Sequence, residues 1–319
     1  MAVIALDLGG TKLACGIFEK SGTIRHKNSA PLEQRNGDEV GSLIVHQIQT
    51  LFQFAQKDKI TIDAIGICVP GISYAKKGTV WAPNIPGWDN YHLRDKIQST
   101  IRDVKIPILI DSDRACSILG ETWLGAAKGC SDAIFIAVGT GIGAGIMIDG
   151  RILRGSNDIA GAAGWLALDR PFNKKYISCG CFEQQASGEG IAKTAKEFLE
   201  TDKNYSGILR EKKIDDINAH DLFSAFLVHD VIAEKVIGQA IELWGMAAAN
   251  LVSIFNPEKI IFGGGVFGPA LQFLPAIKEE ARNWAQPISI TQVSFEGPTL
   301  GSDSVLYGAG CLALRALDK

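Results

Sequence analysis

Three short apolar runs separated by turns open the chain. They cover residues 3–6, 13–18 and 23–28, and the first glycine turn, at residues 7–12, follows the first run. Apolar runs of this length, bounded by glycine and polar residues, predict a three-stranded antiparallel meander. Between residues 38 and 57 apolar side chains recur at intervals of about three and four, which predicts an amphipathic helix.

Strands and helices alternate in the rest of the first half. Apolar runs at residues 64–69 and 106–110 predict two further strands. A segment rich in glycine, proline and tryptophan lies between them and leads into a helix from about residue 93, and another helix is predicted at residues 115–124. This alternation favours an α/β fold.

The second half of the chain repeats the opening pattern. Apolar runs at residues 133–138, 144–148 and 151–153 again follow one another, with the second glycine turn, at residues 139–143, after the first of them. A repeated order of this kind indicates a duplicated unit. Downstream, the pattern predicts a helix at 230–255, a strand at 259–262, a helix ending at 284, a strand at 288–295 and a helix from about 302.

The repeat sets the expected domain organisation. We expect two similar α/β domains, residues 1–128 and residues 129–319, of which the first carries the first glycine turn and the second carries the other. The C-terminal helix is expected to be able to pack back on the first domain.

Composition and charge narrow the functional class. Hydrophobic residues make up 46% and charged residues 21% of the 319 residues, as in ordinary globular proteins. The net charge of -3 provides no positive field, so we expect no nucleic-acid partner. No apolar run suits a membrane span or a signal peptide, so we expect no membrane partner. The seven cysteines are odd in number and lie mostly in apolar runs, which suits reduced thiols in the cytoplasm.

The first glycine turn carries candidate phosphate chemistry. Gly9 and Gly10 allow a sharp bend that exposes backbone N–H groups to an anion, and Thr11 and Lys12 add a hydroxyl and a positive charge. Asp7 stands where a carboxylate could hold the Mg²⁺ that accompanies a nucleotide phosphate. A plain hairpin with glycine at positive φ suits the same residues, and this turn alone leaves both interpretations open.

The second glycine turn strengthens the phosphate interpretation. Gly139, Thr140, Gly141 and Gly143 occupy the corresponding position of the repeated unit. We expect the two turns to face each other across an interdomain cleft and to hold one nucleotide polyphosphate from both sides. A strand follows each turn and the pattern G-x-x-x-x-G-K-[ST] is absent, which argues against P-loop and Rossmann arrangements.

A third glycine segment follows the strand predicted at residues 259–262. Gly263, Gly264 and Gly265 could let an adenosine lie against the backbone. Together with Gly268 they also match the pattern G-x-G-x-x-G, so a dinucleotide-binding protein is an alternative. The segment lies too close to the C-terminus for a complete Rossmann domain, and we favour the adenosine interpretation.

An acidic pair follows the strand predicted at residues 106–110. Asp111 and Asp113 flank Ser112 at the carboxyl end of this strand, where open α/β sheets place their ligands. Asp113 is the candidate general base, since it could accept the proton of a substrate hydroxyl as the hydroxyl oxygen attacks a phosphoryl group. Either aspartate could instead cap the following helix.

Taken together, these segments resemble the ROK family (repressors, open reading frames and sugar kinases) of the actin/hexokinase-like superfamily. The resemblance covers essentially the whole chain, and its parts occur in family order: DLGGTK at Asp7, GICVPG at Gly66, WAPNIPGW at Trp81, DSDRA at Asp111, GTGIGAG at Gly139, CGCFEQQASG at Cys179 and IFGGGV at Ile261. It implies a duplicated actin-like, ribonuclease H-like, two-domain α/β fold with an interdomain cleft. It also implies ATP and Mg²⁺ as cofactors, a sugar as the substrate, and a homodimer or larger homo-oligomer.

The resemblance also implies roles for single residues. It places the general base at Asp113 and the phosphate loops at the two glycine turns. Asn84 and Glu183 match positions where the family has residues on or near the sugar. Ser112 and Trp165 stand at two further substrate positions, although neither is the usual family residue.

The chain departs from the family pattern at these sugar positions. The usual Asn before the catalytic Asp is Ser112, a sugar-contacting Glu is Ala162, and a His that touches both sugar and zinc is Trp165. Trp165 could stack on a sugar ring, although an indole beside alanines is more often part of a core. Because hydrogen-bonding groups are missing, we do not assign glucose as the substrate.

The zinc-binding segment of the family is contracted here. The usual Cys-x-Cys-Gly-x-x-Gly-Cys-x-Glu reads Cys179-Gly-Cys-Phe-Glu183, with no nearby histidine. Zinc requires four ligands, so we expect no structural zinc. Cys179 and Cys181 could still bind an adventitious metal, but we favour their interpretation as packing thiols.

We therefore predict a sugar kinase that uses ATP to phosphorylate a hydroxyl of a hexose or hexose derivative. A catalytically silent sugar-binding sensor of the same fold is the alternative, because the sugar positions are altered. Regulators in the family carry a DNA-binding helix-turn-helix before the two domains. We expect none here, since the chain starts at its first predicted strand.

Overall fold

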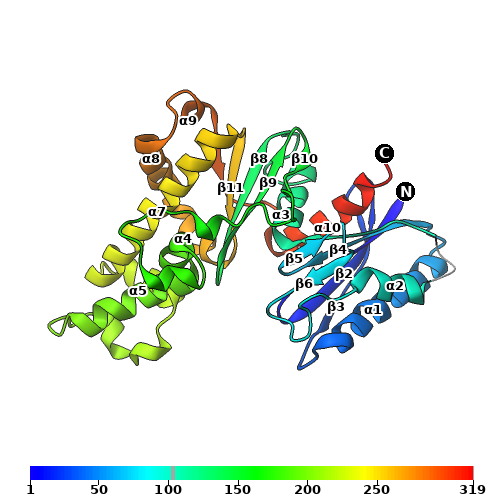
Figure 1. Cartoon of the computed structure of the whole chain (residues 1–319), viewed down its shortest axis with the longest axis horizontal. Coiled ribbons are helices and arrows are strands. Elements are labelled where there is room, and N and C mark those ends of the chain that lie inside the picture. Colours follow the sequence, from blue (N-terminus) through cyan, green and yellow to red (C-terminus); the bar gives the residue numbers. More distant parts are fainter. Residues whose placement is uncertain (102–104, 319) are drawn as a thin grey trace. The chain divides into compact units, whose positions relative to one another are not determined.

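The computed structural model describes residues 1–101 and 105–318, which form two compact units (Figure 1). Unit 1 comprises Met1–Gly129, Ile152–Ala160 and Pro298–Lys319. Unit 2 comprises Cys130–Arg151 and Gly161–Gly297. Each unit therefore takes residues from more than one stretch of the chain, and the C-terminal stretch belongs to unit 1.

Unit 1 is built on a five-stranded sheet with the order β3-β2-β1-β4-β7. Its strands are β1 (Ala2–Leu8), β2 (Lys12–Glu19), β3 (Ile24–Pro31), β4 (Ile62–Val69) and β7 (Ile108–Ser112). The first three strands form the predicted antiparallel meander, and β4 and β7 run parallel to β1. The carboxyl ends of β1, β4 and β7 consequently lie at one edge of the sheet.

Helices cover both faces of this sheet. α1 (Gly37–Lys57) and α2 (Leu93–Thr100) share a core with alternate residues of β1 such as Ile4 and Leu6, whereas Val3 and Ala5 pack with the opposite layer. That layer consists of α3 (Asp113–Trp123) and α10 (Ser304–Arg315) (Figure 1). β1 is buried on both faces, which explains why it is an almost continuous apolar run. A hairpin of β5 (Ile72–Tyr74) and β6 (Thr79–Trp81) completes the strands of this unit.

The helices α3 and α10 pack unusually closely. A Cβ on Gly308 of α10 would lie 1.8 Å from the Cys116 carbonyl oxygen of α3, so no larger residue fits there. A Cβ on Gly66 of β4 would similarly lie 1.9 Å from the Ala309 carbonyl oxygen. Glycine at these positions lets the C-terminal helix lie directly on α3 and on the sheet.

Unit 2 repeats the strand order of unit 1. Its sheet has the order β10-β9-β8-β11-β12, formed by β8 (Ala133–Val138), β9 (Ile142–Ile148), β10 (Arg151–Ile152), β11 (Lys259–Gly263) and β12 (Ser294–Glu296). β8 is antiparallel to β9 and parallel to β11, as β1 is antiparallel to β2 and parallel to β4. The predicted duplication and the α/β fold class are confirmed.

Helices form the other part of unit 2. The α-helices are α4 (Cys181–Ala186), α5 (Gly188–Thr201), α6 (Ala219–Phe226), α7 (Val231–Phe255), α8 (Leu274–Trp284) and α9 (Ser289–Gln292). Short 3-10 turns occur at Ala163–Trp165, Lys174–Ile177, Ile208–Glu211, Ile214–Asp216, Gly265–Phe267 and Pro269–Phe273, and in unit 1 at Gly301–Asp303. Trp244 of α7 is fully buried in the core between these helices and the sheet. Within the described parts of the chain, no helix combines the length and the apolar character that a membrane span requires.

The strand predicted at residues 288–295 is wrong over most of its length. Residues 289–292 form the short helix α9, and only Ser294–Glu296 join the sheet as β12. The Gln286 side-chain oxygen accepts hydrogen bonds from the N–H groups of Ile288 and Ser289, both at 2.8 Å. This local cap starts a helical turn in a segment whose residues favour a strand.

Candidate functional site

Acidic residues gather at the carboxyl edge of the unit 1 sheet. Asp7 on β1 pairs in register with Cys68 on β4, which pairs in turn with Asp111 on β7. Burial raises the pKa of Asp7 from 3.8 to about 6, a hydrogen bond with Cys68 opposes this shift, and the charge of Asp113 adds to it. The structure therefore brings Asp7 and Asp113, both predicted from the sequence, to one edge of one sheet.

A buried ion pair fixes the end of β7. Asp111 is 3% exposed, and both of its carboxylate oxygens accept hydrogen bonds from Arg154. Arg154 also lies 3.9 Å from Asp158, whose other carboxylate oxygen accepts a hydrogen bond from the Ala75 N–H at 3.1 Å. Burial raises the pKa of Asp111, and the Arg154 guanidinium opposes the shift. Residues 152–160 are thus tied to the strand that leads into Asp113.

Asp113 is the first residue of α3. The N-cap is Ser112, whose hydroxyl accepts a hydrogen bond from the Ala115 N–H at 3.3 Å, so neither aspartate is the cap. Asp113 is exposed, and its Oδ1 accepts a hydrogen bond from the Arg114 N–H at 2.8 Å. Desolvation by the surrounding protein raises the Asp113 pKa, and the positive charge of Arg114 opposes the shift. An accessible carboxylate at the carboxyl end of a strand suits a general base.

The first glycine turn joins β1 to β2 and presents its residues to solvent. The Gly9 N–H donates to the Lys12 carbonyl at 3.0 Å, and Gly10, Thr11 and Lys12 are exposed. Neither Gly9 nor Gly10 has a positive φ, so the hairpin with glycine in that conformation is not the one that forms. The exposed Asn84 lies beside this turn, with its amide nitrogen 3.8 Å from the position of a Cβ on Gly10.

The second glycine turn joins β8 to β9 and is supported by two helices. The Gly139 N–H donates to the Gly141 carbonyl at 2.9 Å, and the Gly188 N–H at the start of α5 donates to the Gly139 carbonyl at 2.8 Å. The Glu183 side chain of α4 reaches the other end of the turn and accepts a hydrogen bond from the Ile142 N–H at 2.6 Å. Burial raises the Glu183 pKa, and this hydrogen bond opposes the shift.

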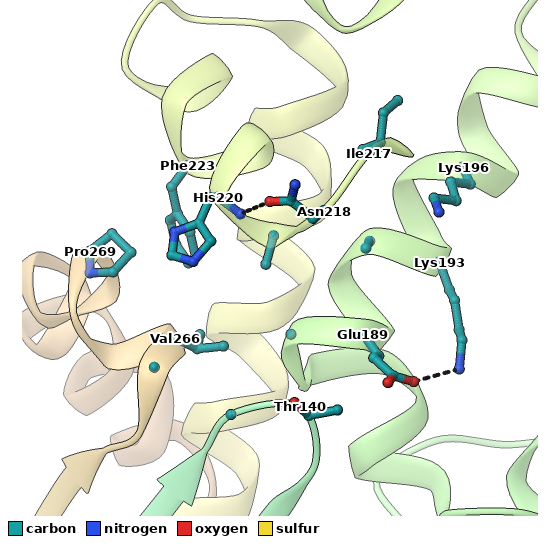
Figure 2. Close-up of a pocket in the computed structure, with 15 residues that line it drawn as sticks. Thr140, Glu189, Lys193, Lys196, Ile217, Asn218, His220, Phe223, Val266 and Pro269 are labelled. Atoms are coloured by element: carbon teal, nitrogen blue, oxygen red, sulfur yellow. Dashed lines mark hydrogen bonds and ion pairs between the residues drawn. The ribbon is translucent and has the colours of Figure 1, made fainter. Parts of the chain in front are cut away.

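The second glycine turn opens into a cavity of about 530 Å³ within unit 2 (Figure 2). Its lining combines part of the turn, the N-terminal part of α5, α6 with the two residues before it, and the segment after β11: Gly139, Thr140, Gly188, Glu189, Ala192, Lys193, Lys196, Ile217, Asn218, Ala219, His220, Phe223, Gly265, Val266 and Pro269. The volume lies in the range of small-molecule and cofactor sites.

Two sides of the cavity differ in chemistry. Figure 2 shows Lys193 and Lys196 of α5 on one side, and His220, Phe223 and Pro269 on the other. Lys193 forms an ion pair with Glu189 at 3.2 Å, and the Lys196 ammonium donates to the Asp215 carbonyl at 2.7 Å. A flat apolar group and an anionic group could therefore both find complementary surfaces here.

Glycine at two lining positions leaves space that the protein itself does not fill. A Cβ on Gly139 or on Gly265 would meet no atom within 4 Å, and neither residue has a positive φ. Packing and backbone conformation therefore do not require glycine at these two positions. Their bare backbones face the cavity, which suits close approach of a ligand.

The predicted residues of the third glycine segment divide into two groups. Gly265 lines the cavity, whereas Gly263 ends β11 and Gly264 packs on β8, where its Cβ would lie 2.4 Å from the Val138 carbonyl oxygen. A 3-10 turn follows the segment, whereas the dinucleotide alternative requires an α-helix. Gly141 and Gly143 also lie outside the cavity lining.

Most of the cavity wall was not predicted from the sequence. The helices α5 and α6, with the two residues before α6, contribute ten of the fifteen lining residues, among them Lys193 and His220. One signal was available, since a serine precedes the helix that starts at Gly188, and Ser187 is indeed its N-cap. The spacing of Lys193 and Lys196 then places both on one face of the helix.

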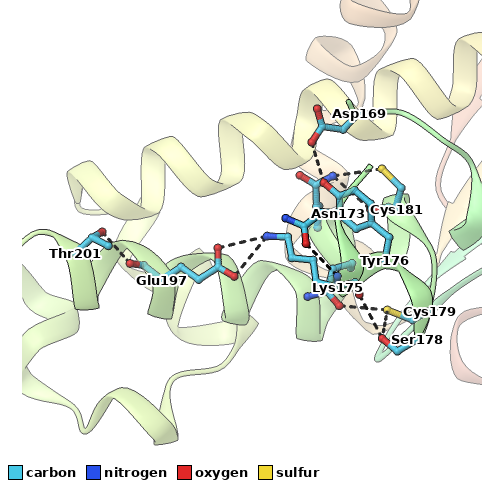
Figure 3. Close-up of polar contacts among 11 residues, drawn as sticks. Asp169, Asn173, Lys175, Tyr176, Ser178, Cys179, Cys181, Glu197 and Thr201 are labelled. Atoms are coloured by element: carbon cyan, nitrogen blue, oxygen red, sulfur yellow. Dashed lines mark hydrogen bonds and ion pairs between the residues drawn. The ribbon is translucent and has the colours of Figure 1, made fainter. Parts of the chain in front are cut away.

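The contracted zinc segment is held by polar contacts of the protein (Figure 3). The Tyr176 hydroxyl donates to Asp169 at 2.9 Å, and Lys175 forms an ion pair with Glu197 of α5 at 3.5 Å. The Cys179 thiol lies 3.3 Å from the Gln184 side-chain oxygen. Among residues 1–101 and 105–318, no cluster of three or more histidine, cysteine or acidic side chains could hold a metal ion.

The side chain of Trp165 is exposed, although burial tendencies predict that an indole beside alanines is buried. It ends a 3-10 turn in which Ala163 and Gly164 are buried, but Trp165 itself is 58% exposed. The expectation that this indole belongs to a core is therefore wrong. Trp88, in contrast, is fully buried and donates its indole N–H to the Gly37 carbonyl at 2.8 Å.

Comparisons with known proteins cover the chain almost from end to end. The model of the ROK family matches residues 3–316. A glucokinase from Halalkalibacterium halodurans is 33% identical over 317 residues, which are 97% of this chain and 94% of that protein. Among solved structures, a ROK hexokinase from Thermus thermophilus matches all of this chain and all of that one with a TM-score of 0.83 and 27% identity. A ROK family glucokinase from Streptomyces griseus in complex with glucose and AMPPNP matches 99% of this chain and 100% of that one with a TM-score of 0.74 and 28% identity. The chain therefore belongs to the ROK family.

Proposed function

We propose that this protein transfers the γ-phosphoryl group of ATP to a hydroxyl of a hexose or hexose derivative. The observation that carries the proposal is the cavity of unit 2, where the bare backbones of Gly139 and Gly265 line one space with Lys193 and Lys196. Relatives named glucokinase, one of them solved with glucose and AMPPNP, support the same activity.

In this proposal unit 2 binds the nucleotide. The apolar side of the cavity near Phe223 and Pro269 would receive the base, and the second glycine turn would present N–H groups and the Thr140 hydroxyl to the phosphates. Lys193 would add a positive charge near the phosphates.

Unit 1 would supply the groups that act on the acceptor. Asp113 would accept the proton of the sugar hydroxyl while the hydroxyl oxygen attacks the γ-phosphorus, and ADP would leave. Thr11 and Lys12 of the first glycine turn would contact the transferred phosphoryl group.

A magnesium ion fits the residues at this edge. Oxygen donors suit Mg²⁺, which is usually held by one or two carboxylates together with substrate phosphates, and the Asp7 carboxylate meets this requirement. Asp7 would help to hold the ion. When bound, Mg²⁺ would neutralise charge on the β- and γ-phosphates.

The sugar would contact Asn84, Ser112, Glu183 and Trp165. Ser112 is short and Trp165 is exposed, which leaves room and an apolar surface for a substituted sugar ring. This is the reason for including hexose derivatives in the proposed substrate class.

The test is release of ADP from ATP·Mg²⁺ in the presence of a panel of hexoses, amino sugars and polyols. Turnover with a panel member that Asp113→Asn lowers by about 10²- to 10⁴-fold, with AMPPNP binding unchanged, is the expected result. Sugar binding without turnover across the panel would instead favour the silent sensor. NAD(H) binding that ATP does not displace would favour the dinucleotide alternative.

A further inference from the structure

We propose that Glu183 is a positioning residue that holds the second glycine turn in the conformation that binds nucleotide phosphates. The proposal rests on the proposed use of ATP and adds a role beyond contact with the sugar. It follows from where the side chain of Glu183 lies in unit 2 and from what surrounds it.

The Glu183 carboxylate fits closely against the turn. Its Oε2 accepts the Ile142 N–H at 2.6 Å, where the turn passes into β9. A Cβ on Gly141 would lie 2.7 Å from the same oxygen, and a Cβ on Gly164 would lie 2.9 Å from it. Gly141 and Gly164 have no positive φ, so the space taken by this carboxylate is the reason for glycine at Gly141.

The helix that carries Glu183 is itself fixed on both sides. At its start, Gly180 has φ +92° and packs so closely that a Cβ there would lie 2.4 Å from the Gly164 carbonyl oxygen. At its end, the chain passes through the buried Ser187 into Gly188, which donates to the Gly139 carbonyl at 2.8 Å.

The segment before this helix is anchored as well. The Gly180 N–H donates to the Tyr176 carbonyl at 2.8 Å, and Lys175 pairs with Glu197 on α5 (Figure 3). Glu183 therefore acts from a rigid support. The turn is held at Gly139 by α5 and at Ile142 by Glu183, which leaves Thr140 between two fixed points.

The role can be separated from sugar contact by measuring ligands one at a time. Isothermal titration of the full chain would measure the affinity for three ligands: adenosine, AMPPNP and a sugar. The sugar is glucose or the panel sugar that supports turnover. Loss of the charge-assisted hydrogen bond in Glu183→Ala should lower the affinity for AMPPNP by about tenfold or more. Adenosine carries no phosphate, so its affinity should change by less than about twofold.

Two variants provide controls for this measurement. Glu183→Gln keeps an oxygen that can accept from the Ile142 N–H, so we expect it to retain most of the AMPPNP affinity. Glu200→Ala removes an exposed glutamate of α5 that neither lines the cavity nor supports the helix of Glu183, and we expect no change in the affinity for adenosine or for AMPPNP.

A second-site variant tests the contact itself. Gly141→Ala alone should lower the affinity for AMPPNP, because the Cβ of the new alanine meets the Glu183 carboxylate. In Glu183→Ala/Gly141→Ala the new methyl group enters the space that the carboxylate has left, so the two losses should not add. Additive losses would overturn the proposal.

The remaining outcomes are also decisive. If Glu183→Ala weakens the binding of the sugar alone, Glu183 is not a positioning residue of the turn. The same holds if both Glu183 variants weaken the binding of adenosine as much as the binding of AMPPNP. If the wild-type chain itself binds no AMPPNP, the proposed function fails and this inference fails with it. Wild-type binding with an unaffected Glu183→Ala overturns the inference alone.

Discussion

Removal of the Arg154 guanidinium should destabilise unit 1 by much more than the loss of a surface charge. The side chains of Asp111 and Arg154 are 5% and 33% exposed, and the guanidinium donates to both oxygens of the carboxylate. In Arg154→Met an apolar side chain of similar length replaces the arginine. Asp111 then keeps only the Ser112 N–H, at 2.8 Å, to compensate a buried negative charge.

The size of the effect follows from the burial of the pair. Breaking a buried ion pair by removing one partner costs about 3–5 kcal/mol of unfolding free energy. Because 33% of the Arg154 side chain remains exposed, we expect the lower end of this range, about 3 kcal/mol. In a unit of this size that corresponds to a decrease in Tm of about 6–12 °C.

The assay is urea denaturation of the full chain beside a matched control in the same unit. Lys20 and Asp318 form an ion pair of 3.1 Å with side chains that are 62% and 55% exposed, and Lys20→Met should cost about 1 kcal/mol or less. Asp111→Asn/Arg154→Met should recover part of the loss, since it removes the buried charge of Asp111 and keeps an oxygen for the Ser112 N–H, although Asp158 still loses its pairing with Arg154. A loss in Arg154→Met no larger than that in Lys20→Met would refute this reasoning.

The pH dependence supplies a second check. Without Arg154, burial and the charge of Asp158 raise the pKa of Asp111 and only the Ser112 N–H opposes them, so the folded-state pKa rises further above the unfolded-state value. Between these two pKa values the folded state binds more protons, so the stability of Arg154→Met falls as the pH rises. The difference from wild type should therefore shrink on acidification, and a difference that does not depend on pH would contradict the assignment of the loss to Asp111.

Further predictions concern the two units separately. The pKa of Asp7 is raised to about 6 in the protein without metal, so acidification through this value should protonate it and weaken the binding of Mg²⁺, and in a titration with Mg²⁺ and AMPPNP Asp7→Asn should bind the ion weakly at every pH. Gly264→Ala should weaken the binding of AMPPNP and lower the Tm, because Gly264 has φ +88° and a Cβ there would lie 2.4 Å from the Val138 carbonyl oxygen. Gly268→Ala is the control, since its Cβ would meet no atom closer than 3.6 Å. Trp165→Ala should change the unfolding free energy by less than about 0.5 kcal/mol, because the indole is exposed, while raising the KM for the sugar; an unchanged KM would remove Trp165 from the substrate site.

The sequence was sufficient for the fold because the two sheets depend on local patterns. Apolar runs bounded by turns located β1, β4, β8 and β11 to within a few residues, and the order of the motifs identified the family, which the comparisons confirm. The strand predicted at residues 288–295 failed because a side-chain cap at Gln286 outweighs the strand propensity of the residues that follow it.

The site was predictable only where a motif lies on a strand end. Asp7, Asp113 and the glycine turns were found because strand ends are marked by glycine and acidic residues. The wall formed by α5 and α6 was missed, since residues such as Lys193 and His220 come together only when these helices pack. The exposure of Trp165 was likewise missed, since it depends on which elements pack around the 3-10 turn that this residue ends.

The duplicated sheets have diverged in the row of residues beside each glycine turn. In unit 1 that row is Asp7, Cys68 and Asp111 across β1, β4 and β7. In unit 2 the residue two positions before the turn is Ala137, which pairs with Gly263 on β11. In unit 1 Asp111 binds Arg154, which leaves the Asp7 carboxylate to take up a proton or a cation, whereas small residues at the equivalent edge of unit 2 leave a backbone that a large ligand can approach. In the proposed function, one topology used twice would divide a phosphoryl transfer into an acid–base half and a nucleotide half without any change in strand order.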